Sequence, residues 1–300
     1  MKKSEEKINI LVNPNDFGLK SPKKISPITP TKNQKRMLIN FDSYGIKSGN
    51  IVISEKVLGE GTYSQVFEGT VNDKKIGVKQ IKKEWLLLED IDIIKKEISI
   101  HQRLIHQNII KLEGYEETDS KINIILEKAD TSLANKMYRK RIPEDELKPI
   151  IKNILNGIYF LHQNNIVHND VKPQNILMKD NQPKLCDFGH SQIVNEKGKI
   201  QNNGVMGTFG FIAPEIIKGE DYDSKVDLWS LGVIIFIALG GYYPFPSKNN
   251  YVVDSKLVFH ENIWKNISNN AVDFIKKSLC FNPNDRMSTL EAINHLWLVL

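Results

Sequence analysis

Two patterns of hydrophobic and polar positions divide the chain. Between about residues 50 and 127, apolar and polar residues alternate between glycine turns, which is typical of antiparallel strands. One stretch in this half, Ile91 to Ile105, instead has the spacing of a helix, with Ile94, Ile98 and either Leu104 or Ile105 facing inward. From about residue 133 helical spacing dominates, as at Ile151, Ile154, Leu155, Ile158 and Leu161. A strand-rich half followed by a helix-rich half predicts an α+β fold of two lobes with a cleft between them.

Two further segments of the C-terminal half have a clear interpretation. The longest apolar run, Leu231 to Leu239, is about half the roughly 20 residues that cross a membrane, so it predicts a core helix and no membrane span. Ser288-Thr289-Leu290-Glu291 has the form of a capping box and predicts the start of the last helix.

Length and cysteine content restrict the class of protein. With 300 residues the chain is long enough for one large core or two modest ones. Its two cysteines cannot form a disulfide framework or a Cys-rich zinc site. The N-terminal Met1 to Glu6 is charged and no apolar stretch follows it. We therefore expect an intracellular protein, in the cytoplasm, the nucleus or both.

The net charge of +5 belongs to the N-terminal segment. Residues 1–50 hold ten Lys/Arg and four Asp/Glu, whereas residues 51–300 hold 31 and 32. A segment rich in Lys, Asn, Ser and Pro cannot bury enough apolar surface to fold, so residues 1–45 are predicted to be a disordered basic tail. The tail lacks the interleaved aromatic residues of single-strand binders, which favours a solvated linker over a nucleic-acid or membrane partner.

Three hydroxyl–proline pairs lie close together in this tail. They are Ser21-Pro22, Ser26-Pro27 and Thr29-Pro30, the form that proline-directed kinases phosphorylate. Regulation through these sites and a chance occurrence in a proline-containing loop are both compatible with the pattern.

A glycine-rich segment, Gly59-Glu60-Gly61-Thr62-Tyr63-Ser64-Gln65-Val66, follows the apolar run Ile51 to Leu58. Glycines let backbone N–H groups approach phosphate oxygens closely. A strand on each side argues against the dinucleotide-binding turn, which must open a helix. Taken alone, the pattern favours a plain hairpin turn.

A lysine and a glutamate give this segment support. Ile76-Gly77-Val78-Lys79 is a strand that ends in a lysine, and Glu97 lies on the inward face of the helix predicted at Ile91 to Ile105. A carboxylate on a buried helix face needs a cation, so we predict an ion pair between Lys79 and Glu97.

The most specific segment is His168-Asn169-Asp170-Val171-Lys172-Pro173-Gln174-Asn175, and Asp187-Phe188-Gly189 follows it 17 positions after Asp170. Phosphoryl transfer needs a carboxylate for the proton of the attacking hydroxyl, and oxygen ligands for magnesium. Asp170 would supply the first, and Asn175 and Asp187 the second. Two more segments then follow, Gly207 to Glu215 and Asp227 to Gly232.

This ordered set resembles a eukaryotic protein kinase domain of the serine/threonine type over about residues 51–298. The resemblance implies a strand-rich N-lobe at about 46–128 with one key helix, a helical C-lobe at about 129–300, and an ATP cleft between them. It implies transfer of the γ-phosphoryl group of Mg-ATP to protein Ser/Thr hydroxyls, with ATP and Mg²⁺ as cofactors. The segments from Phe259 to Ile275 and from Asn282 to Leu298 resemble the calmodulin-dependent and calcium-dependent kinase group.

The resemblance also assigns site residues. The catalytic residues are Asp170, Lys172, Lys79 and Glu97, and the metal ligands are Asn175 and Asp187. Gly207 and Thr208 are expected to dock the substrate. Glu215 is expected to pair with Arg286, and Asp227 to brace the catalytic loop. The nucleotide contacts are expected at Leu58, Gly59, Glu60, Gly61, Thr62, Tyr63, Ser64, Val66, Lys79, Leu126, Glu127, Ala129, Leu177 and Asp187.

The activation loop departs from the family pattern in two ways. Asn169 replaces the arginine that normally receives a phosphate on the loop. The loop itself, Gln192 to Gly207, contains no Ser, Thr or Tyr. Both features predict a kinase that does not depend on activation-loop phosphorylation.

Other departures leave alternatives open. His101 replaces an apolar residue in the stack that links the lobes with Leu112, Phe188 and His168, and it either loosens the helix or finds a hydrogen bond. Gln174 replaces an acidic residue that binds arginine in many relatives, and Asp130 is a candidate for the ribose contact. Cys186 is expected to be a small buried residue.

Two other functions fit a two-lobed fold. One is a pseudokinase that binds a partner or nucleotide without chemistry, but the sequence retains Lys79, Glu97, Asp170, Asn175 and Asp187. The other is a small-molecule phosphotransferase, which the peptide-docking form of Gly207 to Glu215 opposes.

Overall fold

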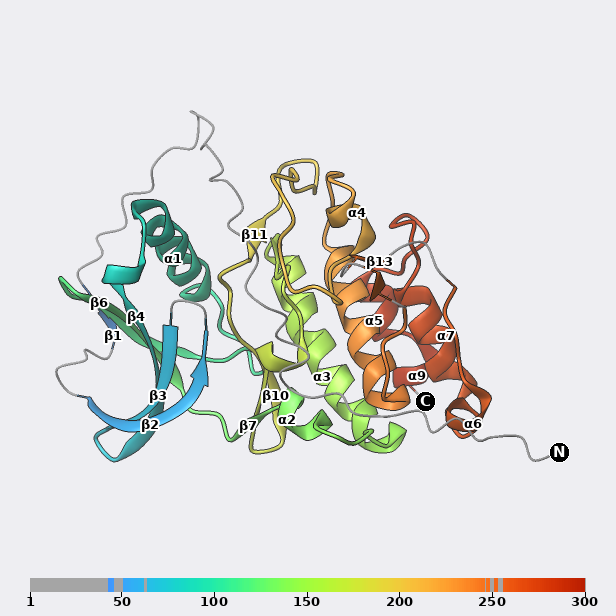
Figure 1. Cartoon of the computed structure of the whole chain (residues 1–300), viewed down its shortest axis with the longest axis horizontal. Coiled ribbons are helices and arrows are strands. Elements are labelled where there is room, and N and C mark those ends of the chain that lie inside the picture. Colours follow the sequence, from blue (N-terminus) through green and yellow to red (C-terminus); the bar gives the residue numbers. More distant parts are fainter. Residues whose placement is uncertain are drawn as a thin grey trace.

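The computed structural model describes residues 43–45, 51–61, 64–245, 247–248, 251–252 and 256–299. In this part of the chain a strand-rich lobe and a helix-rich lobe lie side by side (Figure 1). The predicted two-lobed α+β fold is therefore confirmed. Most of the predicted tail, with its three hydroxyl–proline pairs, lies outside the described residues; its last three residues, Ser43–Gly45, form a strand.

The N-lobe is built on a six-stranded sheet with the order β1-β5-β6-β4-β3-β2, in which every neighbouring pair is antiparallel. Asn72 and Asp73 join β3 to β4 and both have positive φ. Asn and Asp tolerate this backbone, and two such residues make a tight hairpin turn that matches the strand twist. The strands are β1 (Ser43–Gly45), β2 (Val52–Glu60), β3 (Ser64–Val71), β4 (Lys74–Lys82), β5 (Leu112–Glu117) and β6 (Lys121–Glu127).

Helix α1 (Leu88–His101) follows the short 3-10 turn η3 (Lys83–Trp85) and packs on the sheet. Its start is earlier than the predicted Ile91, because Asp90 Oδ2 accepts the N–H of Leu87 and closes the first turn. Leu104, beyond the helix, is buried, whereas Ile105 is 87% exposed. The shared core of helix and sheet is Ile81, Ile94, Ile98, Tyr115, Ile122 and Ile124.

The C-lobe contains most of the helices and several short strands. Its helices are α2 (Leu133–Met137), α3 (Glu144–Gln163), α4 (Pro214–Ile217), α5 (Lys225–Gly240), α6 (Glu261–Trp264), α7 (Asn269–Ser278), α8 (Thr289–Ile293) and α9 (Leu296–Val299), with the 3-10 turn η4 (Pro173–Asn175). Its strands are β7 (Thr131–Ser132), β8 (Ile166–Val167), β9 (Ile176–Lys179), β10 (Gln182–Leu185), β11 (Gln192–Ile193), β12 (Ser247–Lys248) and β13 (Tyr251–Val252).

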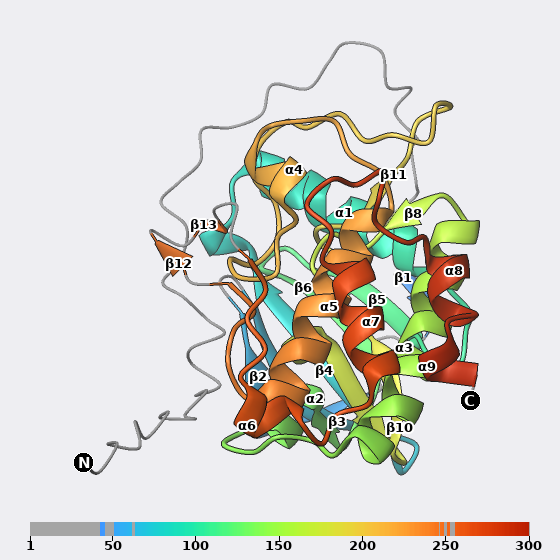
Figure 2. The ribbon, with the colours of Figure 1, turned by 90° about the vertical axis from the view of Figure 1, so that its right-hand side faces the viewer.

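Helix α5 is the centre of this lobe. Every residue from Val226 to Gly240 is buried, so the helix has no polar face, and α3 and α7 pack against it (Figure 2). A Cβ on Gly232 would lie 2.6 Å from Cβ of Ser278 in α7, so glycine is what allows these two helices to approach. The core helix predicted at Leu231 to Leu239 is confirmed as part of α5.

Two other sequence predictions have mixed outcomes. The capping box from Ser288 to Glu291 is present, but it opens α8, and α9 follows, so the prediction that it opens the last helix is wrong. Among the described residues, no helix combines the length and the apolar character that a membrane crossing requires.

Candidate active site

Lys79 in β4 lies at the centre of the candidate site. Its Nζ is 2.7 Å from Glu97 Oε1 in α1 and 3.0 Å from Asp187 Oδ1, so the predicted ion pair with Glu97 is present. Burial alone would lower the pKa of Lys79, but Asp187 and Glu97 together raise it above its ordinary value. The positive charge of Lys79 in turn holds the pKa of Asp187 below its usual range. Lys79 and Asp187 are therefore both charged at neutral pH.

The loop after β8 is held in place by one buried carboxylate. Asp227, in the first turn of α5, accepts the backbone N–H of His168 at Oδ2 and that of Asn169 at Oδ1, both at 2.9 Å. Asn169 has a positive φ of 65°, a conformation that asparagine tolerates. Because two successive N–H groups are fixed, the backbone that carries Asp170 is fixed as well.

The carboxylate of Asp170 is held by three side chains. Oδ1 accepts a hydrogen bond from the hydroxyl group of Thr208 at 2.7 Å. Oδ2 accepts hydrogen bonds from Lys172 Nζ at 2.8 Å and from Asn175 Nδ2 at 3.0 Å. Lys172 Nζ also donates to the Thr208 hydroxyl at 2.8 Å. Asp170 is buried, so this network sets the direction of both its oxygens. An oriented carboxylate that already accepts a hydrogen bond from a hydroxyl group has the geometry of a general base.

Asn175 and Asp187 come from neighbouring segments. The N–H of Cys186 donates to the carbonyl oxygen of Asn175 at 3.0 Å, which places Asp187 directly beside that pairing. Within the described residues no group of three or more His, Cys, Asp or Glu side chains could hold a metal ion. A site with one carboxylate and one amide oxygen suits Mg²⁺, which keeps most of its ligands from water and phosphates.

The predicted nucleotide contacts, which include Lys79 in β4 and Asp187 after β10, lie on five strands and in three segments between strands. Leu58, Gly59 and Glu60 belong to β2, Ser64 and Val66 to β3, Leu126 and Glu127 to β6, and Leu177 to β9; Gly61 follows β2 and Ala129 lies between β6 and β7. The side chains of Val66, Leu126 and Leu177 are half-buried. Thr62 and Tyr63 lie outside the described residues.

The comparisons with known proteins agree with this geometry. The family model described as protein kinase domain matches residues 52–298. The chain belongs to the protein kinase family. Its fold and its ordered motifs are those of a kinase domain, and two of the three relatives below are named as serine/threonine-protein kinases.

Three relatives illustrate the match. The chain is 31% identical to human serine/threonine-protein kinase D3 and 30% identical to serine/threonine-protein kinase dkf-2 of Caenorhabditis briggsae, each over 82% of this chain. The matched part covers only 29% and 22% of those two relatives, so this chain spans less than a third of their length. It is also 30% identical to a probable myosin light chain kinase of Dictyostelium discoideum, over 84% of this chain and 76% of that protein.

Phe188 of the kinase domain lies between two histidine rings. Its ring centroid is 4.7 Å from that of His101 and 5.3 Å from that of His168. His101 is buried and its Nε2 is 2.7 Å from the carbonyl oxygen of Ile110, so of the two alternatives for this histidine the hydrogen bond is correct. Leu112, the fourth predicted member, packs against the core shared by α1 and the sheet.

Burial gives His101 a predictable effect on stability. It lowers the pKa of His101 from 6.5 to about 4, so the folded protein keeps the ring neutral while the unfolded chain protonates it. Stability from this group is complete above pH 6.5 and declines as the pH falls towards 4. Between pH 7 and pH 5 we expect His101 to cost about 2 kcal/mol of unfolding free energy.

Urea denaturation of the wild type and of His101→Leu at both pH values measures this cost. Carboxylates titrate equally in the two proteins, so the difference between their pH dependences belongs to His101. Equal losses of stability between pH 7 and pH 5 in the two proteins would contradict the assignment.

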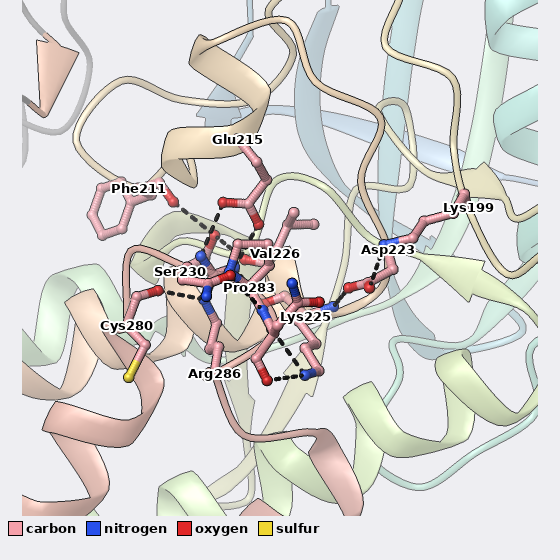
Figure 3. Close-up of polar contacts among 12 residues, drawn as sticks. Lys199, Phe211, Glu215, Asp223, Lys225, Val226, Ser230, Cys280, Pro283 and Arg286 are labelled. Atoms are coloured by element: carbon pink, nitrogen blue, oxygen red, sulfur yellow. Dashed lines mark hydrogen bonds and ion pairs between the residues drawn. The ribbon is translucent and has the colours of Figure 1, made fainter.

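A buried ion pair joins α4, which follows the activation loop, to the C-terminal part of the C-lobe (Figure 3). Arg286 Nη1 and Nη2 donate to the two carboxylate oxygens of Glu215 at 2.6 and 2.9 Å. Arg286 Nε also donates to the carbonyl oxygen of Cys280, and its guanidinium lies 5.1 Å from the ring centre of Trp229. The predicted pairing of Glu215 with Arg286 is therefore present, and it ties α4 to the segment before α8.

The other residues singled out in the sequence, Asp130, Gln174 and Cys186, have simple local environments. One Asp130 oxygen accepts the N–H of Asp180 at 2.9 Å. Oε1 of Gln174 is buried without a hydrogen-bond partner in the described part of the chain. Cys186 is buried, and burial raises the pKa of its thiol well above the ordinary value, as expected of an inert thiol.

Sequence analysis missed three residues that support the site. His162 at the end of α3 contacts Asp227 Oδ2 at 2.8 Å and the Thr289 hydroxyl at 2.6 Å. Lys179 and Lys184 both contact Glu127. A histidine on the buried face of a helix was the only local signal for the first. The two lysines had no local signal, because a lysine in a short strand is ordinarily a surface charge.

Proposed function

We propose that this kinase domain transfers the γ-phosphoryl group of Mg-ATP to serine and threonine hydroxyls of proteins. The observation that carries the proposal is the Asp170 carboxylate, which Lys172 and Asn175 orient and which accepts the hydroxyl of Thr208. A hydroxyl already occupies the position of a proton donor, as the substrate hydroxyl would in the reaction. The names of the relatives support the serine/threonine class.

In the proposed mechanism Asp170 accepts the proton of the substrate hydroxyl. Lys172 moves no proton; its ammonium group lies beside the carboxylate and offers positive charge to the transferred group. Glu97 keeps Lys79 directed into the site, where its ammonium group would bind phosphate oxygens.

ATP and Mg²⁺ are the proposed cofactors. When bound, Mg²⁺ would offset the negative charge of the phosphates, which otherwise repels the attacking oxygen. Asn175 and Asp187 would bind it, and the backbone of the glycine-rich loop would cover the phosphates. The backbone of Glu127 to Ala129 would bind the adenine, with the apolar contacts from Leu58, Val66, Leu126 and Leu177.

Gly207 and Thr208 are proposed to position the peptide substrate. Gly207 has a φ of +103°, and a Cβ there would lie 2.7 Å from the carbonyl oxygen of Asn169. Only glycine allows the docking segment to lie this close to the catalytic loop. The contact supports a role for Thr208 next to the transferred group.

We further propose that the activation loop orders without a phosphate. Asn169, in place of the phosphate-binding arginine, donates from Nδ2 to the carbonyl oxygen of His190 at 3.0 Å. Ile200 and Tyr222 exchange two backbone hydrogen bonds, at 2.8 and 3.1 Å. Lys199 Nζ lies 2.9 Å from Asp223 Oδ2. Neutral bonds and one ion pair between described residues thus take the place of a phosphate and its receptor.

Asn202 links this loop to the segment that follows it. Its Nδ2 donates to the carbonyl oxygens of Ile216 and Glu220 at 3.0 and 3.1 Å, and its N–H donates to Asp221 Oδ1 at 3.1 Å. The exposed neighbour Asn203 makes none of these bonds among the described residues.

The test is a phosphorylation assay with phosphatase-treated bacterial protein. We expect labelled phosphate from Mg-ATP on Ser and Thr of a generic protein substrate, without prior phosphorylation. Asn202→Ala should lower kcat/KM about tenfold, the equivalent of one or two lost hydrogen bonds, and Asn203→Ala should not.

Three outcomes would contradict these proposals. A phosphate between Asp187 and Glu215 that proves necessary for activity would overturn independence of the loop. Nucleotide binding without any phosphoryl transfer would favour a pseudokinase. Phosphoryl transfer to small molecules alone would favour a small-molecule phosphotransferase.

Finer statements about this kinase are also proposals. The resemblance of the segments from Phe259 to Ile275 and from Asn282 to Leu298 supports a place in the calmodulin-dependent and calcium-dependent group. The lobe boundary near residues 128 and 129, the regulatory use of the three hydroxyl–proline pairs and an intracellular location rest on the sequence.

A further inference from the structure

The side chain of Glu127 connects the two lobes. Glu127 is the last residue of β6, and its side chain is only 7% exposed. Oε1 accepts the N–H of Lys111 at 2.8 Å and Lys184 Nζ at 2.9 Å, and Oε2 accepts Lys179 Nζ at 2.7 Å. Two C-lobe ammonium groups therefore hold one carboxylate at the end of the N-lobe sheet.

Lys179 and Lys184 belong to a single hairpin. Lys179 ends β9 and Lys184 lies in β10, and these two strands pair antiparallel. The segment after Glu127 is bonded to the same hairpin, because the N–H of Asp130 donates to the carbonyl oxygen of Met178 and Asp130 Oδ2 accepts the N–H of Asp180. The connection between the lobes is thus attached to the hairpin through both Glu127 and Asp130.

The hairpin and the segment directly after it carry two residues of the proposed nucleotide site. Leu177 lies two positions before Lys179 in β9, and Asp187 lies three positions after Lys184. The backbone of Glu127 is itself proposed to bind adenine. One carboxylate therefore fixes the adenine-binding backbone relative to the strand that carries an apolar contact and the segment that carries a proposed magnesium ligand.

The opposite charges of Glu127 and the two lysines strengthen their contact. Burial alone would raise the pKa of Glu127, but its hydrogen bonds from Lys179, Lys184 and the Lys111 N–H lower it below its ordinary value. Each ammonium–carboxylate contact is a charge-assisted hydrogen bond, which is stronger than a neutral one. Removing one member of such a group leaves the others without a full set of partners.

Glu113 provides a matched comparison within the N-lobe. Its carboxylate is also nearly covered and pairs with two lysines, Lys74 at 2.7 Å and Lys111 at 2.8 Å. Both of these lysines belong to the N-lobe, so the Glu113 cluster has the same chemistry but does not cross between the lobes.

We propose that the side chain of Glu127, held by Lys179 and Lys184, is a positioning residue that sets the two ends of the Mg-nucleotide site relative to each other. This inference rests on the proposed function. It assigns Glu127 a role for its carboxylate in addition to its backbone, and it assigns Lys179 and Lys184 to the same task.

The test measures Mg-ADP affinity of the full chain by isothermal titration calorimetry. Glu127→Gln should weaken Mg-ADP binding about tenfold, the size of a moderate coupling between sites, and Glu113→Gln should leave it unchanged. Lys179→Met should weaken binding in the same way, and Lys179→Arg should restore it. In steady-state assays Glu127→Gln should raise KM for ATP more than it lowers kcat, because the base Asp170 is untouched.

Several results would overturn the inference. Equal Mg-ADP affinity in Glu127→Gln and Glu113→Gln, with cooperative unfolding in both, would mean that the carboxylate has no positioning role. If Glu127→Gln fails to fold, unchanged affinity in Lys179→Met and Lys184→Met decides against it in the same way. A wild-type chain that binds no Mg-ADP would reject the proposed function and this inference with it. If the wild type binds Mg-ADP and the variants bind it equally well, only the inference is rejected.

Discussion

Replacing Asp170 by asparagine is expected to lower kcat by about 10³-fold, the usual contribution of a general base. Asparagine keeps the shape of the side chain but cannot accept the proton of the substrate hydroxyl. It also loses the charge that now faces Lys172 Nζ at 2.8 Å. Nucleotide binding should persist, because Lys79 and Asp187 do not depend on Asp170 for their contact at 3.0 Å.

The measurement is the rate of phosphate transfer at saturating Mg-ATP, together with Mg-ADP affinity. Asp145→Asn provides the control, since Asp145 is exposed in the first turn of α3 and its change is chemically identical. If Asp170→Asn retained the wild-type rate, Asp170 would not be the base. If the variant lost nucleotide binding as well as phosphoryl transfer, its low rate would reflect a disrupted site and not the loss of the base.

Replacing Arg286 by methionine is expected to lower the free energy of unfolding by about 3 to 5 kcal/mol, the usual cost of breaking a buried ion pair. Both side chains of the pair with Glu215 are almost completely buried, so water cannot reach the carboxylate that would be left. The carbonyl oxygens of Cys280 and Lys225 would lose a donor as well. Figure 3 shows how these partners surround the guanidinium.

Chemical denaturation compares this variant with Lys277→Met. Lys277 and Asp273 form an exposed pair one helical turn apart in α7, which is worth less than about 1 kcal/mol. The double variant Glu215→Gln with Arg286→Met should recover part of the loss, because the unpaired charge is gone. Equal stability of Arg286→Met and Lys277→Met would show that the buried pair contributes no more than the exposed one.

The proposed catalytic side chains and their order along the chain could be predicted from the sequence alone. The segment from His168 to Asn175 places Asp170, Lys172 and Asn175 within six positions of one another, so their contacts depend on one loop. Local rules also predicted the strand–loop–strand unit around Gly59 and Gly61 and the capping box at Ser288. The periodicity of Ile151 to Leu161 correctly identified a buried helix face. These features depend on neighbouring residues, which a sequence pattern records.

Helix boundaries were less well predicted. Helical periodicity is satisfied by Ile105 as well as by Leu104, yet α1 ends at His101 and the chain then turns Leu104 inward. Periodicity shows which residues could share a face, but the packing partners decide where the helix stops.

Only the tertiary structure decided which distant charges meet. Glu127 and Lys179 are 52 positions apart, and His162 and Thr289 are 127 apart. No local pattern links such residues, because their contact depends on how a hairpin and a helix pack against other elements. The secondary-structure propensity of a lysine is the same on a surface as beside a buried carboxylate. The fold alone determines its environment. The sequence motifs therefore predict the chemistry of this kinase, whereas packing between elements determines the relative placement of its two lobes.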